Sequence, residues 1–148
     1  MLDEAARFSE TVLAPLNRIG DEVGCKYDKA TGDVTPPPGF KDAFDKFVEG
    51  GWTGLTNSPE HGGQGMPAVL GGVLTELVDS ANLAWGNFPM LSHGAVKALE
   101  TYGEDWQKKV FLEPLVAGTW TGTMCLTEPH CGTDLGLLRT KAEPLGDG

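Results

Sequence analysis

Hydrophobic side chains recur every three or four residues along most of this chain, which is the spacing of one face of an α-helix. The repeating stripes lie within residues 3–24, 40–48, 67–81, 91–102 and 104–118. Pro15 falls inside the first stripe and predicts a kink there. Between the first two stripes, residues 25–39 are polar and rich in proline, so we expect a loop. The pattern therefore predicts a bundle of amphipathic helices.

The period changes after Gly118. In residues 119–126, threonines and a cysteine alternate with Trp120, Gly122, Met124 and Leu126, which predicts a strand. A second strand is expected at about 138–144, before the turn-like residues 146–148. A strand pair needs further partners to bury a face, so we expect the chain to be part of a longer protein. The expected fold is mainly α, with a helical domain at 1–118 and the start of a β domain at 119–148.

Charge and composition narrow the possible partners. The formal net charge of -10 disfavours nucleic acid and anionic membrane surfaces. No apolar run approaches the ~20 residues of a membrane span, and the acidic N-terminus lacks the features of a signal peptide. Three cysteines are an odd number without a close-spaced framework. A reduced, cytoplasmic protein is the expectation.

Residues 125–136, CLTEPHCGTDLG, concentrate the side chains capable of chemistry. Cys125, His130 and Cys131 could ligate a metal, but a zinc site usually draws on two closely spaced ligand pairs and no second pair is present. Cys131 beside His130 could be an activated nucleophile, yet neighbouring side chains usually point apart and no third group orients the base. We therefore predict no metal site and no catalytic residue here.

The same stretch also has the composition of a loop that binds phosphate. Pro129 forces a turn, and residues 132–136 are small or polar, so several backbone N–H groups can point outward together. Thr127 and Thr133 would add hydroxyl donors. An ordinary crossover between two strands with polar capping explains the spacing equally well. The glycine-rich residues 61–65 lack the spacing of a phosphate loop and are expected to be a helix entry, and His93 is expected to be a surface or packing residue.

The stretch MCLTEPHCGTDLG resembles the first signature of the acyl-CoA dehydrogenase family. The matching positions are Cys125, Leu126, Thr127, Glu128, Gly132, Thr133 and Asp134. Cys131 and Leu137 stand where the family usually has a small residue. Residues 51–67 and 102–129 are also similar to family segments, so the resemblance covers most of the chain. The His-Cys form of the loop looks most like the branch that includes 3-methylthiopropanoyl-CoA dehydrogenases.

The resemblance implies an N-terminal helical domain, a middle β-barrel domain and a C-terminal helical domain, with FAD between the last two. Such an enzyme oxidises an acyl-CoA to a trans-2-enoyl-CoA, using a glutamate base for the α-proton and flavin N5 for the β-hydride. The implied flavin contacts are Met124, Leu126, Thr127, Gly132 and Thr133, and Thr133 would also approach the acyl-CoA. The implied role of Glu128 is to fix the loop.

The resemblance places the catalytic glutamate beyond Gly148, so we expect the chain alone to be inactive. The family also implies an electron-transfer flavoprotein as partner and a homodimer or homotetramer. Two alternatives stay open: a helical protein-interaction module without catalysis, and a small metal-binding protein.

Overall fold

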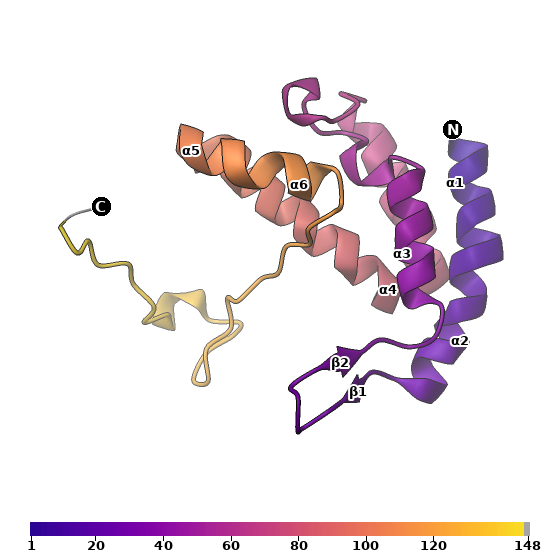
Figure 1. Ribbon diagram of the computed structural model, residues 1–148, viewed down its shortest axis with the longest axis horizontal. Helices are drawn as coiled ribbons and strands as arrows, with labels where there is room; N and C mark the ends of the chain where they lie inside the picture. The colour runs from indigo at the N-terminus through magenta and orange to yellow at the C-terminus, as the bar shows by residue number, and fades with distance from the viewer. Residues whose placement is uncertain (147–148) are drawn as a thin grey trace.

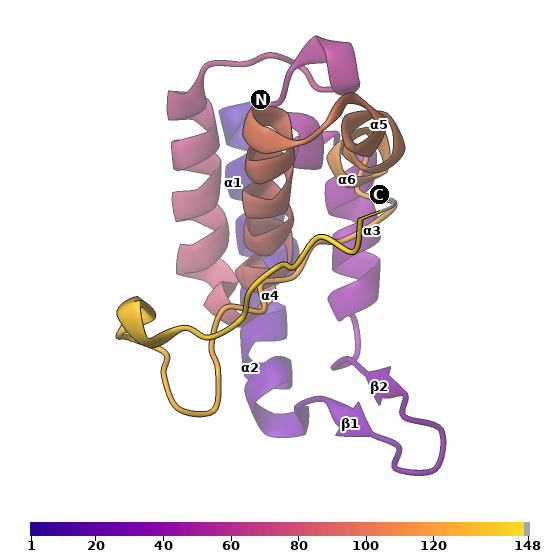
Figure 2. The same ribbon diagram turned by 90° about the vertical axis from the view of Figure 1, so that its left-hand side faces the viewer.

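Helices occupy most of the first 116 residues in the computed structural model, which describes residues 1–146 (Figure 1). The mainly helical fold class expected from the sequence is confirmed. A small hairpin projects from the helices in both views (Figures 1 and 2), and Figure 1 shows the C-terminal segment extending away from them. Within the described range, no helix is long and apolar enough to cross a membrane.

The N-terminal stripe forms one continuous helical rod. It consists of α1 (Leu2–Phe8), a π-helical turn η1 (Ser9–Leu13) and α2 (Ala14–Val23). Pro15 has no N–H to donate, and its ring would clash with the carbonyl of Thr11 in a regular α-helix. The wider π turn removes that conflict. The expected kink is therefore absorbed as a local widening, and the helix continues.

Residues 25–39 are not the simple loop expected from their composition. They contain the antiparallel strands β1 (Lys26–Tyr27) and β2 (Val34–Thr35). The Asp28 backbone N–H donates to the Asp33 carbonyl at 2.8 Å, and the Asp28 carboxylate accepts the Ala30 N–H at 2.8 Å. Two paired residues on each side are too short to show as an alternating pattern, so these strands could not be predicted from the sequence.

The second stripe forms α3 (Phe40–Glu49), followed by the short helical turns η2 (Trp52–Gly54) and η3 (Pro59–His61). The loop after η3 folds back on η2 through main-chain bonds. The N–H of Gly65 donates to the carbonyl of Asn57 at 2.9 Å. A Cβ on Gly63 would lie 2.2 Å from that same carbonyl oxygen, so only glycine fits this close approach.

The third and fourth stripes run together as α4 (Ala68–Tyr102), which is interrupted at Asn82. Asn82 has a non-helical backbone (φ -161°, ψ 86°). Its side chain caps the second half of the helix, because Oδ1 accepts the N–H of Trp85 at 3.0 Å. The amide Nδ2 donates to the carbonyl of Leu13 at 3.3 Å and ties the bend to the N-terminal rod. Two helices were predicted here, and α4 is two helices joined by a sharp bend.

The fifth stripe forms α5 (Asp105–Gln107), a second π turn η4 (Lys108–Leu112) and α6 (Glu113–Val116). The expected start is confirmed, since the N–H of Glu104 donates to the Gln107 side chain at 2.8 Å in a capping box. Here too the π turn ends two residues before a proline, Pro114.

Two groups of buried side chains hold these helices together. In the larger group, Trp85 is fully buried, its ring centroid lies 5.4 Å from that of Phe47, and its indole N–H donates to the carbonyl of Phe40 at 3.1 Å. The other buried hydrophobic members are Ala5, Phe8, Leu13, Ala43, Leu55, Leu74 and Val78. The smaller group joins the second half of α4 to α6 and consists of Val96, Leu112, Leu115 and Val116.

The chain after Gly118 has no strand ladder within the described residues. The segments 119–127 and 138–144 were both expected as strands, but neither pairs with another strand. This region holds a single bridge between Glu128 and Cys131 and a short turn η5 (Leu135–Leu137). A strand exists only when a second strand satisfies its backbone groups. The expected turn at 146–148 lies mostly outside the described residues.

Candidate functional site

The segment carrying the signature leaves the helices through fixed contacts. Gly118 has a left-handed backbone (φ 74°) and reverses the chain after α6. The carbonyl of Pro114 then accepts two bonds, from the Trp120 N–H at 3.1 Å and from the Thr119 hydroxyl at 3.1 Å. The first residues of the segment are therefore held against the end of α6.

A second contact fastens the segment to α4. The N–H of Gly122 donates to the hydroxyl of Ser92 at 3.0 Å. A Cβ on Gly122 would lie 2.8 Å from the Cβ of Ala95 and 3.2 Å from the Cα of Ser92. Gly122 is thus the point at which the main chain can approach the helix closely.

Beyond this contact, the signature residues are open to solvent. Leu126, Thr127, Gly132 and Thr133 are all exposed, and the Met124 side chain is 64% exposed. The structure brings Thr127 and Gly132 together, since a Cβ on Gly132 would lie 3.4 Å from the Thr127 methyl group. Residues five apart in sequence therefore form one exposed edge.

Several polar groups on this edge are unused. Within residues 1–146, the backbone N–H groups of Leu126, Thr127, Gly132 and Thr133 have no acceptor, and neither do the two threonine hydroxyls. Free N–H and O–H donors are suited to phosphate oxygens or to the polar edge of a ring. The arrangement can accept an anionic or acceptor-rich ligand.

A network of bonds closes the loop that carries Gly132 and Thr133. The Glu128 carboxylate accepts the Thr140 hydroxyl at 2.6 Å and the Thr140 N–H at 2.8 Å, and it accepts the Arg139 N–H at 3.1 Å. The Thr140 hydroxyl, followed by the two backbone N–H groups, holds the pKa of Glu128 below its usual value. His130 Nε2 lies 2.9 Å from the carbonyl oxygen of Leu137.

The structure also groups the side chains that suggested metal or thiol chemistry. Ligand atoms of Glu128, His130 and Cys131 all lie within 4.8 Å of one another. Cys125 is not in this group, and the three cysteines of the chain are free thiols. His130 Nε2 is already engaged with Leu137, and Glu128 with Thr140, so the group is committed to bonds within the loop.

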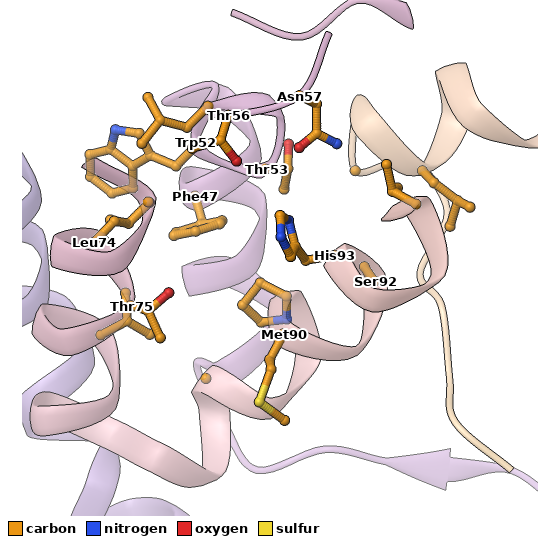
Figure 3. A pocket seen from close by; sticks show the side chains of 18 of the residues that line it. Phe47, Trp52, Thr53, Thr56, Asn57, Leu74, Thr75, Met90, Ser92 and His93 are labelled. Carbon is orange, nitrogen blue, oxygen red and sulfur yellow. The ribbon is translucent and has the colours of Figure 1, made fainter. Parts of the chain in front are cut away.

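A separate cavity of about 300 Å³ lies among α3, η2 and the two halves of α4 (Figure 3). Its wall is mainly apolar, with Phe47, Trp52, Leu74 and Met90 among the lining side chains. One end is polar, and includes Thr53, Asn57, Ser92 and His93. Asn57 is buried, and its Oδ1 has no hydrogen-bond partner within the described residues.

His93 borders this polar end. Figure 3 shows its ring directed toward Thr53. The side chain keeps an exposed edge, yet partial burial, and then the charge of Lys97, lower its pKa below the ordinary value of 6.5. His93 therefore favours its neutral form.

The cavity was not predicted from the sequence. Its residues come from separate stripes, and each was interpreted as a core, packing or surface position. A polar wall could have been indicated only by the buried polar residue Asn57, in the bend between η2 and η3, and its burial is known only from the structure. Two residues join the cavity to the segment that carries the signature. Ser92 lines the cavity and accepts the N–H of Gly122, and Trp120 lines the cavity and is itself part of that segment. The cavity and the segment are therefore adjacent.

Comparison with known proteins shows which family this chain resembles. The sequence profile described as "Acyl-CoA dehydrogenase, N-terminal domain" matches residues 1–119. The chain is 45% identical over 147 residues to the 3-methylmercaptopropionyl-CoA dehydrogenase of Ruegeria pomeroyi, covering 99% of this chain and 25% of that protein. The chain spans about a quarter of the length of the curated relatives it matches.

Solved structures give the same answer. The butyryl-CoA dehydrogenase of Megasphaera elsdenii superposes with a TM-score of 0.73 at 28% identity, covering 90% of this chain and 33% of that one. A chain from the work on the electron transferring flavoprotein of Acidaminococcus fermentans and flavin-based electron bifurcation superposes with a TM-score of 0.79 at 27% identity, covering 99% and 35%. The chain belongs to the acyl-CoA dehydrogenase family.

Proposed function

We propose that this chain supplies the helical wall and one edge of the flavin site of an FAD-dependent acyl-CoA dehydrogenase. Residues 1–118 form the N-terminal helical domain, and residues 119–148 begin the middle β domain. The whole enzyme oxidises an acyl-CoA to a trans-2-enoyl-CoA. Bound FAD supplies the hydride acceptor for this reaction.

The observation that carries this proposal is the set of unused donors at the signature. The free N–H groups of Leu126 and Thr127, with the Thr127 hydroxyl, suit the pyrimidine edge of the flavin ring, where reduced flavin gathers negative charge. The free N–H groups of Gly132 and Thr133 suit the pyrophosphate, and Thr133 also faces the acyl-CoA. Met124 is exposed and apolar, so it can lie against the flat ring.

The adjoining cavity is proposed to hold the end of the acyl chain. The apolar part of its lining suits an alkyl or thioether chain. The relative from Ruegeria pomeroyi is named for a 3-methylmercaptopropionyl substrate, which carries a thioether. The cavity adjoins the signature segment at Ser92 and Trp120, so an acyl chain in the cavity would lie beside the proposed flavin edge.

None of residues 1–148 is proposed as catalytic, and the glutamate base is assigned to sequence beyond Gly148. The chain alone is therefore expected to show no reduction of a dye acceptor with any acyl-CoA.

An electron-transfer flavoprotein is the proposed electron acceptor, and the whole enzyme is proposed to be a homodimer or homotetramer. The structural relative studied with an electron transferring flavoprotein supports the first of these partners.

The test is a titration of purified protein containing residues 1–148 with FAD, followed by the change in flavin fluorescence. Thr127→Val removes one proposed donor. Because one hydrogen bond contributes about 1 kcal/mol, the dissociation constant for FAD is expected to rise roughly fivefold. Thr123→Val is the matched control, because Thr123 is exposed on the same segment and has no proposed contact. Equal affinities for both variants would refute the assignment of Thr127. A helical interaction module without catalysis predicts no flavin binding by any variant.

A further inference from the structure

Residues 128–140 form a closed loop whose two ends are joined by side chains. The family resemblance already implies that Glu128 fixes this loop. We propose that His130 is a second positioning residue, which together with Glu128 holds the loop in the shape presenting Gly132 and Thr133 to the FAD pyrophosphate. We name the bonds from these two side chains to Leu137, Arg139 and Thr140 the clasp. The inference rests on the flavin site proposed above, and it assigns to these side chains a role in cofactor affinity without contact to the cofactor.

The first half of the clasp is the Glu128 carboxylate. It accepts two backbone N–H groups and one hydroxyl from residues eleven and twelve positions later in the chain, at 2.6–3.2 Å. Hydrogen bonds to an ionised acceptor are roughly twice as strong as neutral ones. The Glu128 side chain is only 15% exposed, so little water competes for its oxygens.

The second half of the clasp is the bond between His130 and Leu137. His130 Nε2 lies 2.9 Å from the Leu137 carbonyl oxygen and 3.5 Å from Glu128 Oε2, so the two halves adjoin. His130 occupies a variable position of the family signature. This bond is therefore a property of this sequence, in which a histidine happens to reach across the loop.

Further hydrogen bonds form two turns within the loop. The main chains of Glu128 and Cys131 exchange two bonds, at 2.9 and 3.1 Å, and the Asp134 carboxylate accepts the Gly136 N–H at 3.1 Å. Gly132 and Thr133 lie between these two turns. No residue of the loop belongs to either buried group. The loop therefore depends on its own hydrogen bonds for order, and a loop that is ordered before binding loses less conformational entropy when it binds.

The first arm of the test needs no cofactor. Amide hydrogen exchange at Arg139 and Thr140 is measured in the full 148-residue chain and in Glu128→Ala, Glu128→Gln and His130→Phe. Glu128→Ala is expected to raise the exchange rate of both amides roughly tenfold or more, since bonds to charged groups are the stronger class. Glu128→Gln, which keeps one acceptor oxygen, is expected to lie between Ala and the unchanged chain. Glu143→Gln is the matched control, because Glu143 is an exposed carboxylate in the same segment that pairs with Lys141.

The second arm measures affinity for FAD and, separately, for inorganic pyrophosphate. Glu128→Ala and His130→Phe are expected to weaken both, while the melting temperature of the helices stays unchanged because the clasp touches neither buried group. Exchange rates equal to those of Glu143→Gln would overturn the clasp itself. Faster exchange with unchanged affinity would overturn its role in binding. These affinities are measured in the whole enzyme that contains residues 1–148, because the family resemblance places FAD between the middle and C-terminal domains. An unchanged enzyme that protects both amides but binds no flavin would instead refute the proposed function.

Discussion

The bend at Asn82 offers the sharpest test of how this fold is held together. Asn82 is 1% exposed, and its amide makes two bonds, one to the Trp85 N–H at 3.0 Å and one to the Leu13 carbonyl at 3.3 Å. Asn82→Ala removes both. Loss of a helix N-cap costs about 1 kcal/mol, and loss of a buried amide hydrogen bond costs about 1 kcal/mol more. The small cavity left by the missing amide adds to this, so we expect a loss of about 2–3 kcal/mol.

Two further replacements separate the contributions. Asn82→Ser keeps an oxygen for the cap and loses the bond to Leu13, so it is expected to cost about 1 kcal/mol. Asn82→Asp keeps the cap acceptor, but it places a buried charge beside the carbonyl of Leu13 and is expected to cost more than Asn82→Ala. The predicted order of stability is therefore Ser above Ala above Asp.

The assay is urea unfolding followed by tryptophan fluorescence, which reports on the buried Trp85. Against a typical total stability of 5–15 kcal/mol, a loss of about 2–3 kcal/mol shifts the midpoint clearly. Asn87→Ala is the control, since Asn87 is exposed on the same helix. If Asn82→Ala and Asn87→Ala unfold at the same urea concentration, the bend does not depend on the Asn82 side chain and the reasoning fails.

Three other outcomes are expected. Trp85→Phe removes the bond to the Phe40 carbonyl and leaves space in the larger buried group, so the free energy of unfolding should fall by about 2–3 kcal/mol in the same assay; an unchanged midpoint would contradict this. Gly122→Ala should force the signature segment away from α4, because its Cβ would lie 2.8 Å from that of Ala95, and limited proteolysis beyond Gly118 should become faster while the helices melt as before. The pKa of His93 is lowered in the folded chain, so its contribution to stability is complete above the ordinary value of 6.5 and is lost as the pH falls through the lowered pKa. The free energy of unfolding should therefore decrease on acidification below about pH 6.5, and His93→Phe should make that decrease shallower.

The helices were predictable because their evidence is local. Each buried side chain in a stripe is three or four positions from the next, so the sequence carries the full period of a helix face. The acidic residues Glu104 and Asp105 and the terminal Gly118 indicated the start and the end of the last helical segment, and the capping box formed by Glu104 and Gln107 was found in the structure. Neither π turn was predicted in form, although the kink expected at Pro15 marked the position of the first.

The signature was also local. Twelve consecutive residues contain the glycines, threonines and carboxylates that suggested a ligand-binding loop, and the resemblance drew on the same residues. The assignment of Met124, Leu126, Thr127, Gly132 and Thr133 to FAD stays a prediction. What the structure adds is that the donors at four of these positions are exposed and unused.

Other features depend on residues far apart in the sequence. The bond from Asn82 to Leu13 spans 69 positions, and the bond from Trp85 to Phe40 spans 45. The cavity gathers side chains from four elements, and the clasp joins residues that no periodic pattern relates. Periodicity determines which face of each helix is apolar, but it does not determine which faces meet. The helical elements and the composition of the signature loop are therefore encoded in short stretches of sequence. The bend in α4 and the cavity exist only because tertiary packing brings distant residues together. The closed loop exists only because the Glu128 carboxylate reaches backbone N–H groups eleven and twelve positions later.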